Sequence, residues 1–505
     1  MAQQTMGKAQ LAICTGLRWR QRPEAACHPK PSRETRLGFA FRCLIFFGVL
    51  LLGTGAWGQG VGGDQLWLNQ SDIAGLDDDI DAIAQDEERI YVAGEPQSDD
   101  GDEDFFVRAL DKATGAEVWQ QQFGQTVKND DADALAVQGS RVFLLGAIEE
   151  SEEIGLEDRD ILVAAFDSQT GNELWRKQLG QPERDDAANA IATQGSRVFV
   201  AGMITTEAGD EDLYVTALDV GTGNVLWEYQ FDLAGGNETP SALAVQPGRV
   251  FVAGRARTAA GDEDLFMWAL DEETGALLWH EPFNLAGGND TVNALVVGGE
   301  QVFVAGVSQL GPVDPDPDAT QPDTDMVVLA RDQETGALRW QKQFDLEQDG
   351  VGSDNPMDIA ADTSQVYIAA EGVTARGDTD AVVMALDQVT GDLRWQQQFD
   401  LEQDDTGDDD ARALVVNLDR VIVSWRGETS RGDRDTVVMA LDPVTGGLQW
   451  QNQFDLNMGD DSLDLMLVDA ERVYVGGESA TGPEDPDPEA IKPDTDAVVR
   501  ALIFP

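Results

Sequence analysis

Short apolar runs separated by turn residues recur along most of the chain. Between residues 241 and 283 there are four, "SALAV", "RVFVAG", "DLFMWAL" and "ALLWHEPF", dominated by valine, alanine, phenylalanine and tryptophan. Runs of this length and composition are typical of β-strands rather than helices. The pattern therefore predicts a unit of four short strands, and no helical apolar pattern of useful length follows residue 58.

The turn between the third and fourth runs belongs to a phrase that occurs seven times. "ALDEETGALLWHEPF" begins at Ala269, and close copies begin at residues 109, 165, 217, 330, 385 and 440. A period of about 50–60 residues indicates a repeat architecture with one continuous core. The aspartate of the phrase starts a tight turn and the glycine supplies the positive φ that closes it. The Thr-Gly pair is therefore predicted to be turn chemistry rather than a ligand motif.

Four antiparallel strands repeated radially form a β-propeller, and the tryptophans count its blades. One tryptophan marks the outermost strand of each unit, namely Trp67, Trp119, Trp175, Trp227, Trp279, Trp340, Trp395 and Trp450. The unit of Trp67 lacks its first three strands, and "SLDLMLV", "RVYVGG" and "DAVVRALIF" supply them between residues 462 and 504. The sequence predicts an all-β, eight-bladed β-propeller of four-stranded antiparallel blades, with the last blade closed by the N-terminal strand. The tryptophans are predicted to pack between blades.

The "ALDxxTGxxxW" phrase resembles the repeat of the quinoprotein-dehydrogenase-like (PQQ-like repeat) β-propellers, over residues 64–505. That superfamily includes enzymes that use pyrroloquinoline quinone (PQQ) and non-enzymatic relatives such as the propeller lipoprotein of the outer-membrane assembly machinery. The enzymes imply a quinone held against a disulfide of adjacent cysteines, with a calcium ion and an aspartate base. Here the last cysteine is Cys43, so PQQ is not expected and no catalytic residue of the enzymes can be placed on the chain. A cysteine at the mature N-terminus, which the lipoprotein would imply, is also missing. The chain is identified as a non-enzymatic member.

Residues 1–58 are predicted to be a signal peptide with an N-terminal extension, and residues 59–505 the propeller. Arg33, Arg36 and Arg42 precede the apolar run "CLIFFGVLLLG", and small residues follow in "TGAWGQG". We expect cleavage after Gly58 or after Ala56, and a retained anchor is the alternative. The product is expected to be secreted, periplasmic or at the cell surface, as a monomer without a stable membrane span after cleavage.

Charge narrows the classes of partner. The formal net charge is −60, and residues 1–58 carry a net +6, which leaves −66 for the remainder. Such a surface repels nucleic acid, so no nucleic-acid partner is expected, and it suits cations, basic proteins or salty water. The three cysteines all precede residue 59, and His28 and His280 are the only histidines. Thiolate chemistry is therefore excluded from the propeller, and histidine-based metal sites and base catalysis nearly so.

Most of the acid is predicted to gather on one face. In an antiparallel meander the second-to-third loops and the blade-to-blade connections share a face, and here they are the long, acidic segments. An Asp-x-Asp pair precedes the third strand of every blade: Asp102/Asp104, Asp158/Asp160, Asp210/Asp212, Asp262/Asp264, Asp323/Asp325, Asp378/Asp380, Asp433/Asp435 and Asp494/Asp496. Residues two apart at a strand end point to the same side, and paired carboxylates suit Ca2+. The alternative is that these aspartates cap the loops by accepting from backbone amides.

These observations predict a secreted, non-catalytic binding or scaffold module. Its acidic face would meet an unidentified protein or cell-surface partner, with Ca2+ as the candidate cofactor. Two alternatives stay open. One is a PQQ-dependent dehydrogenase-like enzyme that uses an acid pair such as Asp408 and Asp410. The other is a salt-adapted structural surface protein, whose acidity is environmental.

Overall fold

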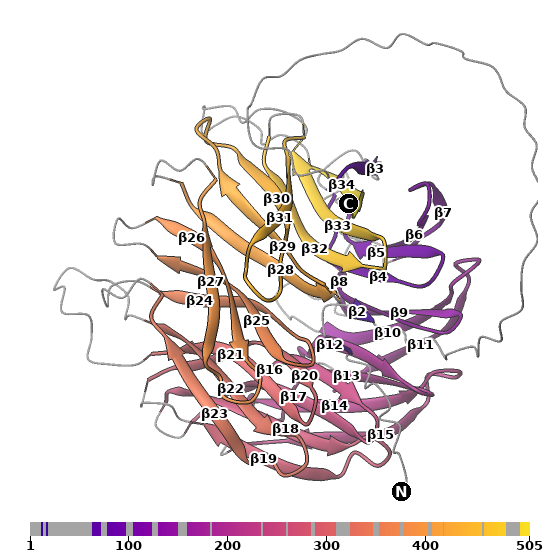
Figure 1. The fold of residues 1–505 in the computed structure, drawn as a ribbon. Helices are drawn as coiled ribbons and strands as arrows, with labels where there is room; N and C mark the ends of the chain where they lie inside the picture. Colours follow the sequence, from indigo (N-terminus) through magenta and orange to yellow (C-terminus); the bar gives the residue numbers. More distant parts are fainter. Residues whose placement is uncertain are drawn as a thin grey trace, which may run out of the picture.

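The computed structural model confirms the predicted fold class. Its strands form eight antiparallel sheets arranged in a ring, an eight-bladed β-propeller (Figure 1). The structure describes residues 12–13, 17–18, 63–71, 78–96, 105–123, 130–149, 159–181, 184–233, 236–258, 261–283, 288–309, 324–346, 353–373, 378–401, 407–417, 419–456, 459–480 and 495–504. Over these residues every regular element is a strand, and no helix has the length and apolarity to cross a membrane.

Each blade runs from an innermost first strand to an outermost fourth strand. Blade 1 contains β4 (Ala82–Gln85), β5 (Arg89–Gly94), β6 (Phe105–Asp111) and β7 (Glu117–Phe123). Blade 2 contains β8 (Asp131–Gln138), β9 (Arg141–Glu149), β10 (Arg159–Asp167) and β11 (Glu173–Leu179). Blade 3 contains β12 (Ala187–Gln194), β13 (Arg197–Thr205), β14 (Glu211–Asp219) and β15 (Val225–Phe231). Blade 4 contains β16 (Glu238–Gln246), β17 (Arg249–Arg257), β18 (Glu263–Asp271) and β19 (Leu277–Phe283).

The second half of the ring repeats the arrangement. Blade 5 contains β20 (Asp290–Gly298), β21 (Gln301–Ser308), β22 (Asp325–Asp332) and β23 (Leu338–Phe344). Blade 6 contains β24 (Asp354–Ala361), β25 (Gln365–Val373), β26 (Thr379–Asp387) and β27 (Leu393–Phe399). Blade 7 contains β28 (Asp409–Asn417), β29 (Arg420–Glu428), β30 (Arg434–Leu441) and β31 (Leu448–Phe454). Blade 8 contains β32 (Asp461–Val468), β33 (Arg472–Ala480), β34 (Thr495–Ile503) and β3 (Gln65–Ser71). The short strands β1 (Ala12–Ile13) and β2 (Leu17–Arg18) extend the sheet of blade 4 at β16.

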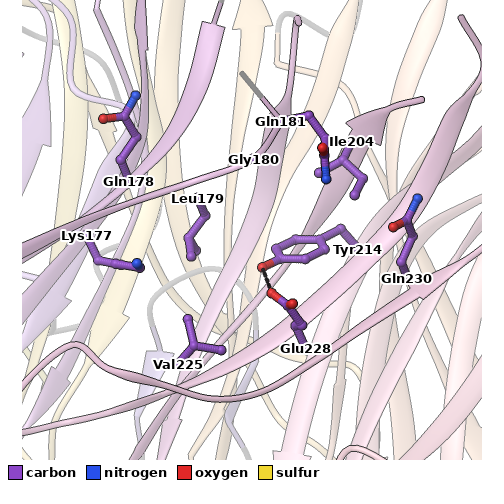
Figure 2. A pocket seen from close by; sticks show the side chains of 10 residues that line it. All are labelled: Lys177, Gln178, Leu179, Gly180, Gln181, Ile204, Tyr214, Val225, Glu228 and Gln230. Carbon is purple, nitrogen blue, oxygen red and sulfur yellow. Dashed lines mark hydrogen bonds between the residues drawn. The ribbon is translucent and has the colours of Figure 1, made fainter. Parts of the chain in front are cut away.

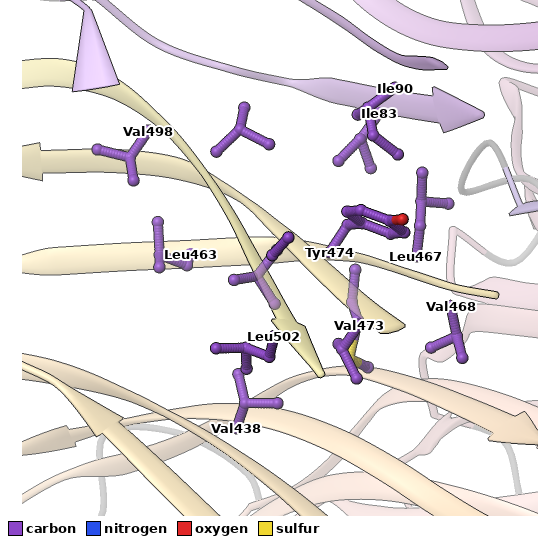
Figure 3. Close-up of a cluster of buried hydrophobic side chains, with 14 of the residues drawn as sticks. Ile83, Ile90, Val438, Leu463, Leu467, Val468, Val473, Tyr474, Val498 and Leu502 are labelled. Carbon is purple, nitrogen blue, oxygen red and sulfur yellow. The ribbon is translucent and has the colours of Figure 1, made fainter. Parts of the chain in front are cut away.

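The core lies between neighbouring blades. The middle strands are buried on both sides, as in β6, because each sheet is covered by a blade on either face. One such layer joins Val438 of blade 7, Tyr474 and Leu502 of blade 8, and Ile83 of blade 1 (Figure 3). This continuous burial explains why the second and third runs of each repeat are almost wholly apolar, whereas the outermost strands carry many polar residues.

The predicted closure of the last blade is confirmed. Strand β3 pairs antiparallel with β34, with Trp67 opposite Ala501 and Asn69 opposite Val499. The strand order in this sheet is β3-β34-β33-β32, so the outermost strand comes from the beginning of the chain and the other three from its end. The free edge of β34 is thereby covered.

The closure also rebuilds a turn from two separate segments. In blade 1 the Gly115 N–H donates to the Asp111 carbonyl at 2.8 Å, and Gly115 has φ +71°. In blade 8 the Gly63 N–H donates to the Ile503 carbonyl at 3.1 Å, and Gly63 has φ +81°. The Ile503 N–H donates in turn to the Asp64 carbonyl at 3.0 Å. Residues just before β3 therefore take the place of the Thr-Gly half of the repeated turn.

The eight tryptophans lie at the junctions between blades. Trp119, 8% exposed, donates from Nε1 to the Ser168 carbonyl of the next blade at 3.0 Å. The same bond links Trp67 to Lys112, Trp175 to Val220, Trp227 to Glu272, Trp279 to Gln333, Trp340 to Gln388, and Trp395 to Pro443. Trp450 is buried at the closure junction, against Gly63. Seven of the eight indoles thus link their blade to the following one by a hydrogen bond, whereas Nε1 of Trp450 has no hydrogen-bond partner among the described residues.

Candidate metal centre

The loops separate onto two faces, as the meander predicts. On one face the first-to-second and third-to-fourth turns meet, and the Gly248 N–H donates to Glu272 Oε2 at 2.7 Å. On the other the second-to-third loops meet the blade-to-blade connections, and the Glu211 N–H donates to Asn237 Oδ1 at 3.2 Å. We call this second surface, which carries the Asp-x-Asp pairs, the acidic face.

The structure describes both members of four predicted pairs and one member of three others. The complete pairs are Asp210 with Asp212, Asp262 with Asp264, Asp378 with Asp380, and Asp433 with Asp435, and the single members are Asp160, Asp325 and Asp496. Asp102, Asp104, Asp158, Asp323 and Asp494 lie outside the described residues.

Side chains position these aspartates. The first member accepts from a threonine hydroxyl four residues earlier, as in Thr206 to Asp210 and Thr429 to Asp433. The second accepts from a glutamine of the outermost strand, and Gln230 Nε2 lies 2.7 Å from Asp212 Oδ2. Equivalent glutamine bonds reach Asp160, Asp325, Asp380, Asp435 and Asp496. Each of these hydrogen bonds uses one oxygen of the carboxylate.

A third carboxylate joins two of the pairs. Asp232 follows the outermost strand of blade 3, and carboxylate oxygens of Asp210, Asp212 and Asp232 all lie within 4.8 Å of one another. Asp433, Asp435 and Asp455 form the corresponding cluster in blade 7. Sequence reasoning missed Asp232 and Asp455, although the recurrent "FDL" phrase of the connections was a usable signal.

The pair of blade 4 differs from this arrangement. Asp262 accepts from the Thr258 hydroxyl, and Asp264 lies in β18 opposite Ala256 of β17. Over the described part of the chain, neither Asp262 nor Asp264 belongs to a group of three converging carboxylates, and the pair of blade 6 also lies outside the two clusters. The connection of blade 4 begins with Asn284, where blades 3 and 7 have an aspartate. Asp264 is a candidate metal ligand by its sequence, as Asp212 is, and it stays a prediction; among the described residues no third carboxylate joins it.

A ring of buried acids, also missed, lies beneath the acidic face. One acid stands at or just before the first strand of each blade: Asp78, Asp130, Asp186, Glu238, Asp290, Asp354, Asp409 and Asp461. The "FDL" leucine directs its backbone N–H at this carboxylate, as in Leu456 to Asp461 at 2.7 Å and Leu346 to Asp354 at 2.7 Å. These acids anchor the connections between blades, and their charge adds to that of the clusters above them.

Comparison with known proteins identifies the family. The family model described as outer membrane protein assembly factor BamB matches residues 57–263, 103–344, 214–427 and 324–482 in overlapping stretches. The chain belongs to this family of PQQ-like propeller repeats. No curated protein matches the sequence significantly.

Solved structures agree on the fold of this BamB-like propeller. BamB from Moraxella catarrhalis superposes with a TM-score of 0.51 at 16% identity, covering 88% of this chain and 100% of that one. The quinohemoprotein alcohol dehydrogenase ADHIIG from Pseudomonas putida gives 0.53 at 15% identity, covering 87% of this chain and 76% of that one. The corresponding enzyme from Comamonas testosteroni gives 0.53 at 13%, with 87% and 76% covered. At these identities the likeness establishes the fold alone.

The enzyme alternative named Asp408 and Asp410 as an acid pair. Asp410 Oδ2 lies 2.7 Å from Arg412, 3.2 Å from Arg426 and 3.5 Å from Arg434. Asp408 Oδ1 accepts from the backbone N–H of Thr379 at 3.1 Å. Both carboxylates are therefore committed to structural contacts. The last cysteine of the chain is Cys43, so the disulfide of adjacent cysteines that the resemblance implies for the enzymes has no counterpart in residues 59–505.

A separate hollow of about 340 Å³ opens between the outer parts of blades 2 and 3 (Figure 2). Lys177, Leu179 and Val225 line it, and the Tyr214 hydroxyl donates to Glu228 Oε2 at 3.3 Å. None of the predicted aspartates or tryptophans belongs to the lining. The hollow therefore does not form part of the acidic clusters.

The buried acids predict an unusual pH dependence of stability. Asp358, 5% exposed, accepts from the Leu414 N–H at 2.8 Å, and burial raises its pKa to about 7. Burial likewise raises the pKa of Asp461 to about 7 and that of Asp409 to about 8, and neighbouring carboxylates add to both shifts. In the unfolded chain such groups titrate near pH 4. The folded protein therefore holds protons that the unfolded chain has released.

We expect the free energy of unfolding in EDTA to rise as the pH is lowered from about 8 to about 5. The stabilisation is complete below the unfolded pKa and is lost as the pH rises through about 7 for Asp358 and Asp461 and about 8 for Asp409. Each group contributes at most about 1.4 kcal/mol per pH unit. Urea unfolding at several pH values measures this slope, and D358N should flatten it. A stability that falls on acidification over this range would contradict the assignment.

Proposed function

We propose that this chain is an exported, non-catalytic PQQ-like propeller that binds a basic protein or cell-surface partner through its acidic face. The observation that carries the proposal is the gathering of carboxylates on the loops of one face of a rigid ring, as in the clusters around Asp212 and Asp435. A net charge of −60 favours a positively charged partner, since electrostatic complementarity steers association. The family description, an outer membrane protein assembly factor, supports a binding role.

Export is part of the same proposal. The predicted cleavage positions, Ala56 and Gly58, lie outside the described residues, so the support comes from the signal-like sequence before them. Ca2+ is proposed as a structural cofactor of the acidic face rather than as a catalyst. Addition of PQQ to the purified protein is expected to give neither an absorbance change nor dye reduction, and either signal would favour the enzyme alternative.

Site-directed photocrosslinking in cells tests the binding face. The exposed Glu207 lies on the acidic face, and the exposed Glu273 lies in a third-to-fourth turn on the opposite face. We expect a photoreactive residue at position 207 to give a discrete crosslinked product, and one at position 273 to give none. Both positions are exposed glutamates on the same ring, so the comparison isolates the face. Equal products from both positions, or products from 273 alone, would contradict the proposal.

A further inference from the structure

The two three-carboxylate clusters lie in segments of different charge. In blade 3 the segment that contains the pair is "EAGDED" and in blade 7 it is "SRGDRD", so Ala208 corresponds to Arg431 and Glu211 to Arg434. Of the two arginines, Arg431 contacts the cluster, whereas Arg434 lies 3.5 Å from Asp410. The remaining members correspond one to one: Asp210 with Asp433, Asp212 with Asp435, and Asp232 with Asp455. The chain therefore contains the same cluster with and without a basic residue at the position of Arg431.

In blade 7 the arginine binds the cluster. Its Nη2 lies 2.9 Å from Asp433 Oδ2 and 2.8 Å from Asp455 Oδ2. These two carboxylates come from the second-to-third loop and from the connection to blade 8, so one cation bridges two segments. Because closely spaced carboxylates repel one another, a positive charge between them stabilises the loop and the connection in their observed positions.

In blade 3 one buried carboxylate oxygen of the cluster has no hydrogen-bond partner among the described residues. This oxygen is Oδ1 of Asp212, a residue that is 5% exposed. The corresponding Oδ1 of Asp435 in blade 7 also has no hydrogen-bond partner among the described residues, but there the positive charge of Arg431 acts on the carboxylate. The neighbours of Asp212, Asp210 and Asp232, both repel its charge, and the fully buried Glu238 lies within electrostatic reach of all three. Arg184, from the preceding connection, donates to the Thr206 carbonyl rather than to these carboxylates. A buried carboxylate oxygen that has neither a hydrogen-bond donor nor a cation beside it lowers the stability of the folded protein.

We propose that Asp210, Asp212 and Asp232 bind a divalent cation at the junction of blades 3 and 4, and that Arg431 replaces this cation in blade 7. The inference deepens the calcium part of the proposed function. All the protein ligands are carboxylates, which suit hard cations and disfavour zinc or copper. Three carboxylates that leave room for water fit the six to eight oxygens, roughly, that Ca2+ accepts better than the strict octahedron of Mg2+.

Melting and calorimetry on residues 59–505 test the proposal. After EDTA treatment, CaCl2 is compared with NaCl of matched ionic strength, because salt alone screens the repulsion of the acidic face. At a Ca2+ concentration about one hundred times Kd, we expect Tm to rise by roughly 3 °C beyond the NaCl value. The variant A208R places the blade 7 arginine in blade 3 and should abolish this calcium-specific rise while the protein stays folded.

Two further variants separate the ligands from general charge. R431A should create a second cluster without arginine and raise the number of Ca2+ ions bound by one. D264N removes the charge of Asp264 in blade 4, where the connection carries Asn284 in place of the third aspartate, and should leave the calcium effect unchanged. Equal melting in the two salts, or a full calcium response in A208R, would overturn the site. Crosslinking from position 207 in A208R tests the binding function separately, since its persistence would leave that function intact.

Discussion

A chain that begins at residue 72 is expected to lose cooperative unfolding and to aggregate at concentrations where residues 59–505 stay monomeric. This truncation removes β3, which leaves the backbone of β34 unpaired, and it removes Trp67 from the junction with blade 1. An unpaired edge strand promotes association between chains. The loss of a buried tryptophan alone costs about 3–5 kcal/mol. Thermal unfolding and size-exclusion chromatography measure both effects.

A shorter truncation supplies the control. A chain that begins at residue 62 keeps Gly63, Asp64 and β3, and should melt as residues 59–505 do.

A circular permutant tests the closure in a second way. In this permutant a two-residue linker joins Phe504 to Gly63, which restores the repeated turn in blade 8. The chain is opened instead in the turn of blade 1 that ends at Gly115, so that turn is broken. We expect the permutant to fold. Unchanged melting of the chain that begins at residue 72 would show that blade 8 is stable with three strands.

The variant G275A is expected to destabilise the propeller by about 2–5 kcal/mol. Gly275 has φ +69°, a conformation that costs an alanine about 1–2 kcal/mol. An added Cβ would also lie 2.5 Å from Cε3 of Trp227 in the preceding blade. Overpacking of this kind costs about 1–3 kcal/mol more, because the indole is held by its bond to the Glu272 carbonyl.

The variant G139A separates the two contributions. Gly139 has a similar φ of +61°, but an added Cβ would meet nothing within 4 Å. It should therefore show the conformational cost alone, and the difference between the two variants in urea unfolding measures the contact with the tryptophan. Equal effects of G139A and G275A would show that the ring shifts freely and that the junction is not tightly packed.

The contact between the repeated glycine and the tryptophan ring is a feature that the turn motif in the sequence does not predict. The sequence explained the glycine by its turn, and the structure adds a second reason, because the ring from the preceding blade lies directly over it. The turn depends on residues that are adjacent in the chain, so it can be predicted from the sequence. The contact depends on how two blades are placed, and that placement is visible only in the ring.

The acidic clusters depend even more on tertiary structure. The Asp-x-Asp pairs were found because their members are two residues apart. Asp232 joins Asp210 and Asp212 only after β14 and β15 have run out and back to the same face, whereas no group of three carboxylates among the described residues includes Asp264. The buried acids beneath the acidic face looked like ordinary loop residues, since exposure depends on what the connections cover. Arg431 looked like one more surface charge, although it lies between two carboxylates.

By itself the sequence determined the strands, the eight repeats, the closure by the residues around Trp67 and the membership of a propeller superfamily. It could do so because strand periodicity and turn chemistry depend on residues that are close together in the chain, and the same pattern recurs in every repeat. Only the tertiary structure decided which carboxylates converge, which acids are buried, and which arginine bridges two carboxylates. Those outcomes depend on the distances between side chains from separate strands and connections, and these distances exist only once the blades have packed.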